Sequence, residues 1–391
     1  MKMFEDHYEE VFDKEDALSS VIKKMDAATT WTPGITSAGL KVLPISGPIE
    51  ADAVAKRTNT SYEAAYSTAD EIGTQLLLSY AGSEHLVRWS AMKTLFDTAK
   101  INGSSLNRLG AYKLSQVLNL CISVAKGSSL IMHRAEKVGA VLSDNANGYK
   151  IMPVPELMDI THDIMENDFG APVFKRGFVN HQYVTATWHL PDKQDEFMDA
   201  YRKAMRNAAP RVFSANFMPA VMFETSDTSH SAATLLPHFV TANGGSFPLC
   251  DPIRVYHKRG TEEGVDLFRL KGQELFPVFM KMKDNVERLS SVVINHPQNA
   301  FIGLCNKADI PKKLASPALE LFLQYLGDGD EPCMALDLYI GICEVMSFAA
   351  ENKYSGEQTL KLMEKTAKVL RYNMEDFDLA GVVAWNNKPE N

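Results

Sequence analysis

Apolar side chains recur at the spacing of a helix through the last third of the chain. Four stretches carry this pattern, residues 268–294, 311–326, 332–350 and 356–372. In the last of them Leu360, Met363, Ala367 and Leu370 lie three and four residues apart, which places them on one helix face. The pattern predicts a helix-rich domain with a loosely docked tail over residues 261–391.

The middle of the chain has a different pattern, because short runs of β-branched and aromatic residues alternate with turn signals. Candidate strands are residues 138–142, 173–178, 183–190, 219–225 and 252–257, with one helix predicted over 155–166. The second and third of these strands are close enough in sequence to form a hairpin. We therefore expect an α+β fold whose central, mostly antiparallel sheet lies in a core over residues 136–260.

The first 135 residues divide into two predicted parts. Residues 1–60 contain an acidic arm followed by an extended segment rich in Pro and Gly. Residues 61–135 predict a helical block, since Leu86, Trp89, Met92 and Leu95 follow helical spacing and Ser83 precedes them as a possible N-cap.

Composition limits the class of protein. The 391 residues carry a net charge of -9, which is typical of a globular protein and not of a strongly basic nucleic-acid coat protein. The acidic N-terminus lacks the features of a secretory signal, and the apolar stretch 334–350 is interrupted by Asp337 and Glu344. Five widely spaced cysteines favour reduced, mostly buried thiols. We expect a cytoplasmic protein (in the host cytoplasm if a phage encodes it) that does not contact membranes.

Motifs for nucleotide, hydrolase and metalloprotease chemistry are absent from the sequence. It contains no glycine-rich phosphate loop, no Gly-x-Ser-x-Gly and no His-Glu-x-x-His. The ten histidines show no spacing that fixes three or four ligands around one metal ion. The sequence therefore predicts no cofactor, no metal site and no catalytic residue.

One polar loop, residues 224–231, allows two interpretations. Its hydroxyls and backbone N–H groups resemble an anion-binding loop, in which Ser226 takes part and Asp227 and His230 form an acid–base pair. Alternatively the Ser and Asp side chains cap a turn by hydrogen bonding the backbone. The capped turn is the favoured interpretation.

Basic residues gather near the predicted strands despite the acidic total. If those strands share one sheet, five cations are expected along one groove: Lys175, Arg176, Arg254, Lys258 and Arg259. Such cations suit phosphates, and Tyr183, Trp188 or Tyr256 would stack on bases. A further basic group, Arg202, Lys203 and Arg206, falls on a predicted helix. The competing interpretation is a solvated strand edge on which Lys and Arg discourage aggregation.

Residues 138–289 resemble the phage/plasmid-like protein family of unknown function that is found on prophages and mobile elements. Three ordered pieces carry the resemblance: residues 139–157 with a strand, a tyrosine and a helix start, the polar loop 223–232, and the strand with a basic His turn at 254–260. The insert 145–148 departs from the compact turn of the family. The resemblance implies a mobile-element origin and no established chemistry.

These observations lead to one preferred function and two alternatives. The preferred function is that of a phage- or plasmid-encoded, non-catalytic accessory protein that forms a homo-oligomer and binds single-stranded nucleic acid, for protection or annealing. The first alternative is a phage structural or assembly protein, or an inhibitor of a host defence protein. The second is an enzyme that uses the Asp227/His230 loop.

Overall fold

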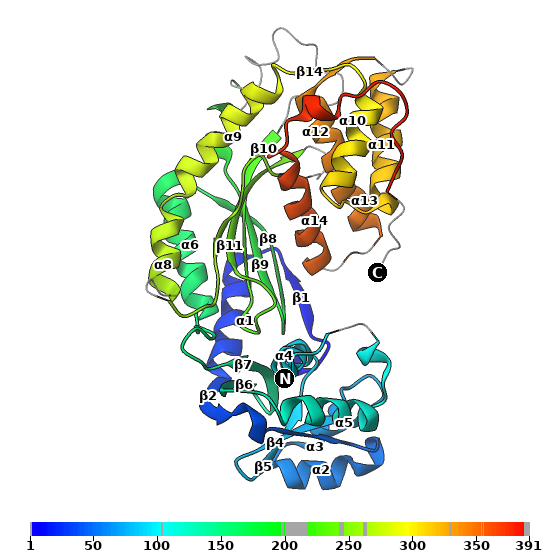
Figure 1. Cartoon of the computed structure of the whole chain (residues 1–391). Coiled ribbons are helices and arrows are strands. Elements are labelled where there is room, and N and C mark those ends of the chain that lie inside the picture. The colour runs from blue at the N-terminus through cyan, green and yellow to red at the C-terminus, as the bar shows by residue number, and fades with distance from the viewer. Residues whose placement is uncertain are drawn as a thin grey trace.

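The computed structural model describes residues 2–102, 105–196, 199, 217–241, 246–260, 264–327, 331–352, 354 and 356–386. Helices make up 48% of the chain and strands 24%, which confirms the predicted α+β class. A large sheet at the centre is flanked by a smaller N-terminal unit at one end and by a group of C-terminal helices at the other (Figure 1). Residues 202, 203 and 206, one predicted basic group, lie outside the described part of the chain.

The central sheet, sheet A, is an antiparallel half-barrel. Its strands follow the order β1-β8-β9-β10-β11-β12, and β13 also pairs with β11. Their bounds are β1 Glu9–Phe12, β8 Val173–Asn180, β9 Val184–His189, β10 Phe217–Thr225, β11 Ala233–Thr241, β12 Ser246–Phe247 and β13 Ile253–Val255. Every pairing is antiparallel, so the predicted hairpin and the antiparallel character of the central sheet are confirmed. The candidate strand at residues 138–142 was wrongly assigned to it, because it belongs to a second sheet.

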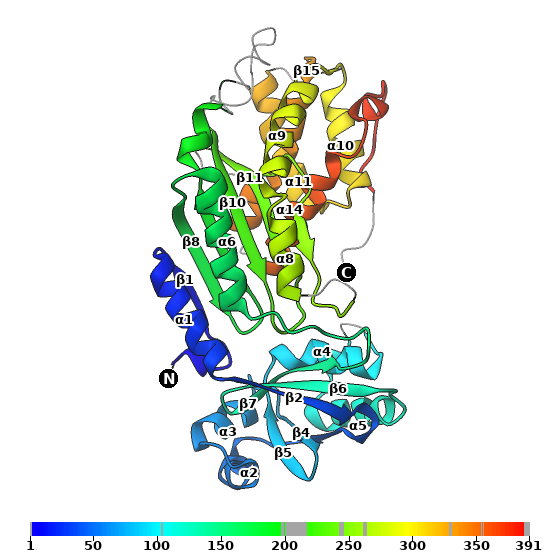
Figure 2. The ribbon, with the colours of Figure 1, turned by 90° about the vertical axis from the view of Figure 1, so that its left-hand side faces the viewer.

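One face of sheet A packs against helices because its side chains alternate. In β9, Val184, Ala186 and Trp188 are buried, whereas the residues between them are partly exposed. The indole Nε1 of Trp188 donates a hydrogen bond to Glu15 over 3.0 Å, which ties the sheet to α1. The helices on this side are α1 Glu15–Ala27, α6 Val154–Phe169, α8 Gly264–Gly272 and α9 Leu275–Leu289 (Figure 2). On the opposite face, Glu224, Thr234 and Leu236 line a cavity.

Residues 29–149 form the N-terminal unit around a second, mixed sheet, sheet B. The strand order is β2-β6-β7-β5-β4-β3, and β5 runs parallel to β7. The strands are β2 Thr29–Thr36, β3 Lys41–Pro44, β4 Leu76–Tyr80, β5 Ser83–Val87, β6 Ser128–Arg134 and β7 Lys137–Ser143. Four helices pack on them: α2 Ala51–Thr58, α3 Tyr62–Ala69, α4 Ser90–Ala99 and α5 Ala111–Ile122.

The predicted helical block over residues 61–135 is therefore wrong. Residues 61–135 are not a helical block, because they contribute β4, β5 and β6 to sheet B, and Ser83 begins a strand instead of capping a helix. Leu76, Leu77 and Leu78 are all fully buried, so this strand lacks the alternation that would have identified it. The acidic arm docks on its own chain, because β1 pairs with β8 and α1 packs on α6.

The last third is helix-rich, as predicted. Its helices are α10 Pro297–Lys307, α11 Lys312–Leu326, α12 Ala335–Cys343, α13 Val345–Glu351 and α14 Gly356–Val369, and the two-stranded ribbon of β14 Val293–Ile294 and β15 Cys333–Met334 joins them. Every residue of α12 is buried. Within the described residues, no helix is both long enough and apolar enough to span a membrane. The cysteines are free thiols, four of them buried and Cys121 partly exposed.

A buried charged network joins the N-terminal unit to sheet A. Asp6 accepts a hydrogen bond from Nζ of Lys137 over 2.7 Å, and its other carboxylate oxygen lies 3.5 Å from Nε of Arg88. Arg88 also contacts Nδ1 of His181, at the turn between β8 and β9, over 2.6 Å. The side chains of Asp6, Arg88 and Lys137 are at most 3% exposed, so water does not screen these charges.

Candidate functional site

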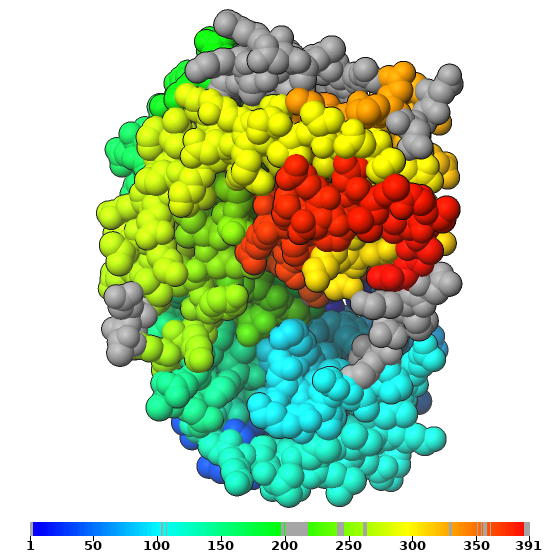
Figure 3. Space-filling model, turned by 45° about the horizontal axis from the view of Figure 1, so that its top comes forward, coloured from blue at the N-terminus to red at the C-terminus, as the bar shows by residue number. Residues whose placement is uncertain are grey.

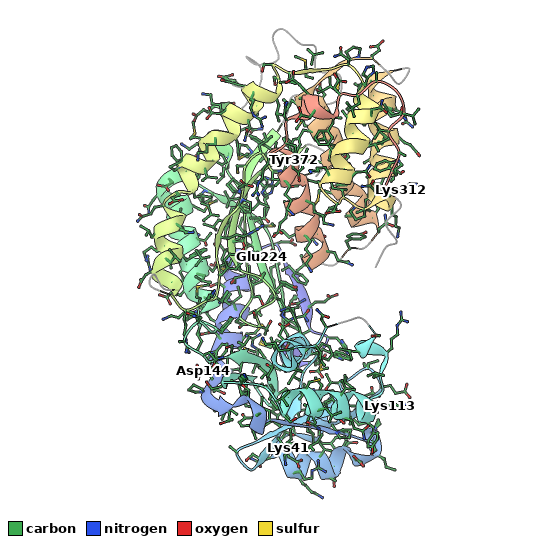
Figure 4. The ribbon with its side chains drawn as sticks, viewed as in Figure 1. Lys41, Lys113, Asp144, Glu224, Lys312 and Tyr372 are labelled. Atoms are coloured by element: carbon green, nitrogen blue, oxygen red, sulfur yellow. The ribbon has the colours of Figure 1, made fainter. Side chains whose placement is uncertain are left out.

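A cleft of about 670 Å³ lies where the N-terminal unit, sheet A and α14 meet. Figure 3 shows a hollow between the C-terminal helices and the cyan segment of the N-terminal unit. Glu224 of sheet A lies between the two ends of the molecule in Figure 4. The charged side chains that line the cleft are Asp97 and Lys100 at α4, Glu224 on β10, Arg254 and Lys258 at β13, and Lys361 and Glu364 on α14. Its size suits a ligand of small-molecule dimensions or a few nucleotides.

The polar loop at the edge of this cleft is a capped turn, which confirms the favoured interpretation. The hydroxyl of Ser226 accepts hydrogen bonds from the backbone N–H groups of Thr228 (3.3 Å) and His230 (3.0 Å). Ser226 and Thr228 are 1% and 0% exposed, so their hydroxyls do not face the cleft as anion ligands. Ser229 has φ +61°, a left-handed conformation that the capped turn supports.

Asp227 and His230 do not form an acid–base pair. The carboxylate of Asp227 makes an ion pair with Arg134 of β6, and Nδ1 of His230 lies 2.8 Å from the hydroxyl of Thr228. Both groups are thus engaged in holding the loop. Among the residues that the structure describes, no three His, Cys, Asp or Glu side chains converge as metal ligands do.

The loop is also fixed to the N-terminal unit from a second side. The hydroxyl of Tyr149 donates to the backbone carbonyl of Asp227 over 3.0 Å, and the ring stacks on His257 at 5.1 Å. Burial raises the pKa of Tyr149 well above its usual value and lowers that of His257 to about 4, so both are neutral near pH 7. The floor of the cleft is therefore rigid and uncharged at this point.

Two of the five predicted nucleic-acid-binding cations are neutralised by carboxylates. Arg254 makes a 2.5 Å ion pair with Glu364 of α14, and Arg259 makes a 2.6 Å ion pair with Asp144. Lys258 lies between them in sequence, is exposed and lines the cleft. Among the described residues it has no carboxylate partner, so its charge is available to a ligand.

Lys175 and Arg176 lie on β8, away from the other three. Arg176 pairs with Thr187, so its side chain is on the same sheet face as the cleft, yet β9, β10 and β11 separate β8 from β13. Four strand spacings correspond to about 19 Å along the sheet. The five cations therefore do not form one continuous row, and only the group at β13 borders the cleft.

Of the three aromatic residues proposed to stack on bases, one is accessible. Tyr256 is 68% exposed and lines the cleft, whereas Trp188 and Tyr183 are 0% and 5% exposed. Trp188 fills the core beneath sheet A, because its strand position points to the helix-covered face. Tyr256 and Lys258 are two residues apart beyond β13, so an exposed ring and an ammonium group without a carboxylate partner among the described residues line the same cleft.

Four further charged residues of the cleft were not predicted: Asp97, Lys100, Lys361 and Glu364. Lys100 ends α4 with φ +55°, and Lys361 and Glu364 lie one turn apart on α14. The sequence carries no signal for them, because α4 and α14 are more than 250 residues apart and meet only through the sheet. Lys100 has no carboxylate partner among the described residues.

The cleft thus holds an exposed aromatic ring, several carboxylates and two ammonium groups that have no carboxylate partner among the described residues. No protein-family model, curated protein or solved structure matches this chain in the comparisons made. Its function is therefore argued from its own residues.

Proposed function

We propose that the protein binds single-stranded nucleic acid in the central cleft and does so without cutting it. The chain acts as an accessory protein of a phage or plasmid, an origin that the resemblance of residues 138–289 supports. The binding mode is stacking of a base on Tyr256, with phosphates contacted by Lys258 and Lys100. A strand that has no sequence preference needs these two kinds of contact, since every base has a π-face and every nucleotide a phosphate.

The observation that carries this proposal is the exposure of Tyr256. The ring, 68% of whose surface is exposed, lines the same cleft as the ammonium group of Lys258, so the two kinds of contact that a single strand needs are available in one place. This mode of binding does not require an element that enters a groove of duplex nucleic acid. Base stacking on one aromatic ring contributes about 1–3 kcal/mol, which is enough to dominate a weak site.

The carboxylates of the cleft limit the affinity of one copy. Asp97, Glu224 and Glu364 repel phosphates, and Glu364 neutralises Arg254. We therefore expect micromolar or weaker binding by a single copy and strong dependence on salt concentration. A homo-oligomer that lines up several clefts along one strand would convert such weak sites into useful avidity.

Replacing Tyr256 by Ala tests the stacking contact. We expect the affinity for a fluorescein-labelled oligothymidylate to fall about 5- to 150-fold, the equivalent of losing one stacked base. Tyr256→Phe should retain most of the affinity, because the ring carries the contact. Fluorescence anisotropy at low ionic strength, followed by titration with NaCl, measures both the affinity and its salt dependence.

The matched control for this variant is Tyr112→Ala on α5. Tyr112 is 66% exposed, close to Tyr256, and does not line the cleft, so its loss should leave the affinity unchanged. Equal effects of the two substitutions would contradict the proposed site. Absence of salt-sensitive binding by the unaltered protein would contradict the function itself and leave an assembly or host-protein-binding role as the alternative.

Replacing Glu364 by Gln should have the opposite effect. The substitution frees Arg254 and removes one negative charge from the cleft, so we expect binding to become roughly three- to tenfold tighter at low salt. The pair is partly exposed and contributes at most ~1 kcal/mol to stability, so the fold should be retained. The anisotropy titration used for Tyr256 provides the measurement.

Glu320→Gln controls for the change in net charge. Glu320 is exposed on α11 and does not line the cleft, so its replacement should change the affinity little. Unchanged or weaker binding by Glu364→Gln would show that Arg254 does not contact the ligand. Adding Arg254→Ala to Glu364→Gln should cancel the gain, because the freed guanidinium is its cause.

A further inference from the structure

Residues 374–386, here called the C-terminal strap, run along α10 and are held chiefly by two asparagine side chains. Nδ2 of Asn299 donates to the backbone carbonyls of Leu379 (2.6 Å) and Gly381 (2.8 Å), and its Oδ1 accepts from the N–H of Val383 (3.3 Å). Asn306 repeats the arrangement with the carbonyl of Ala384 and the N–H of Asn386, over 2.9 and 3.0 Å. The strap lies beside α10 in Figures 1 and 2.

These contacts recognise peptide backbone and not particular side chains. Each asparagine amide offers one donor and one acceptor group, the same pair that a strand neighbour would offer to an extended peptide. Asn299, Gly303 and Asn306 lie four and three residues apart, so they share one face of α10. That face therefore presents a row of amide groups, those of Asn299 and Asn306, that can hydrogen bond an extended chain. We call this row the ladder.

Two side chains of the strap fix its register on the ladder. Asp378 accepts hydrogen bonds from the backbone N–H groups of Asn295 and His296 over 2.9 and 2.6 Å, ahead of the start of α10. Phe377 lies against Gly303, where a Cβ atom would approach the ring to 2.8 Å. Gly303 thus provides a slot for an aromatic ring, and the face selects a segment with Phe-Asp at this position.

The strap buries Met374 fully, and Phe377, Val383 and Trp385 pack partly buried against the core. Beyond Met374, which is 2% exposed, no strap residue is fully buried, and Val382 is 97% exposed. A segment with few buried apolar side chains opens at low cost in free energy. An identical segment from another chain would regain every contact that the first one gives up.

We propose that the Asn299–Asn306 face of α10 is a binding site for an extended peptide, and that its ligand in the assembled protein is the strap of a second copy. Exchange of straps links two copies through contacts already present within one, so it needs no additional apolar surface. The site is distinct from the central cleft and the proposal does not depend on nucleic-acid binding.

The test uses the full chain in two forms that each carry one introduced exposed cysteine, with Cys121 replaced by Ser in both and the four buried cysteines retained. One form carries Lys307→Cys and the other carries Asn386→Cys; both positions border the same recess beside Phe377, and neither supplies a ladder side chain. After mixing at micromolar concentration and adding a short bismaleimide, we expect a crosslinked heterodimer on a denaturing gel. A synthetic peptide of residues 374–386 in excess should suppress it, and Asn299→Ala with Asn306→Ala should reduce its yield roughly tenfold.

Lys113→Cys on α5 replaces Lys307→Cys in the control mixture. It is exposed on the N-terminal unit, so its pairing with Asn386→Cys should give only background crosslinking. Background yield from the Lys307 mixture, or a yield that the peptide does not change, would overturn strap exchange. Because both partners retain the complete chain, circular dichroism and thermal unfolding of each form establish that they are folded.

Discussion

The Asp6→Asn protein should lose about 3–5 kcal/mol of its free energy of unfolding, measured by urea denaturation at pH 7.5. Asp6 is the carboxylate of the buried network between the N-terminal unit and sheet A, where it contacts Lys137 and Arg88. Asparagine keeps the size of the side chain, so the loss comes from charge and not from a cavity. Domains commonly have only ~5–15 kcal/mol in total, so the effect is large.

The physical reason is the pair of cations that the substitution leaves without a counter-charge. Burial lowers the pKa of Arg88 to about 10 and that of Lys137 below its usual value, although the charge of Asp6 acts in the opposite direction on both. The ring of His181 beside Arg88 is neutral and offers no compensation. Two positive side chains that are at most 3% exposed would then face each other in a low-dielectric environment.

Two further variants separate this account from a general sensitivity of the N-terminal segment. Asp13→Asn removes an exposed carboxylate of the same segment and should change stability by less than ~0.5 kcal/mol. Adding Lys137→Met to Asp6→Asn removes one of the two buried positive charges that lack a counter-charge. This should restore part of the lost free energy of unfolding. A free energy of unfolding for Asp6→Asn within ~1 kcal/mol of the unaltered protein would contradict the structural role of the network.

Stability should also fall steeply between pH 6.5 and pH 4. Burial and the neighbouring Arg88 lower the pKa of His181 to about 2, and burial lowers the pKa values of His238 and His257 to about 4. In the unfolded chain these histidines titrate near pH 6.5. The expected result is a protein that is most stable above pH 6.5 and unfolds in mild acid.

The direction of this pH dependence follows from the difference in proton uptake between the folded and the unfolded chain. Burial also lowers the pKa of His133 to about 4. Between about pH 6.5 and pH 4 the unfolded chain therefore binds four protons that the folded chain excludes, so acid favours unfolding, with a limiting slope of ~5 kcal/mol per pH unit. Above pH 6.5 neither state binds them and the full stability is present. Asp26 and Glu344, whose pKa values burial raises, offset part of the loss because they take up protons on folding.

Urea denaturation at half-unit steps from pH 8 to pH 5 measures this slope. Replacing His181 by Gln should reduce the slope by about one proton, whereas His7→Gln, which removes an exposed histidine, serves as the control. A free energy of unfolding that stays constant from pH 7 to pH 5 would show that these histidines are not held neutral in the folded protein.

The sequence predicted those parts of the fold whose patterns are local. The hairpin of β8 and β9 follows from the alternation around Trp188, and α6 and α14 follow from helical spacing with clear ends. Sheet B was missed because its strand at Leu76–Tyr80 is buried on both faces and so resembles a helix core. The parallel pairing of β5 with β7 joins distant segments, and no local pattern reports it.

The candidate site was predicted in part. Tyr256 and Lys258 were recognised from a strand that ends in basic residues, and both line the cleft. The partners that neutralise Arg254 and Arg259, Glu364 and Asp144, are 110 and 115 residues away, so the sequence could not reveal them. The sequence could not show which of the proposed stacking rings is exposed. Trp188 and Tyr256 both lie in strand-like sequence, but on opposite faces of the sheet.

Ultraviolet crosslinking of the full chain to an oligothymidylate, followed by mass spectrometry, tests the central claim most directly. Binding in the cleft predicts that the crosslinked peptide contains Tyr256, and that crosslinking disappears as NaCl is raised. Crosslinks confined to segments that do not line the cleft, or no crosslink at low ionic strength, would contradict it.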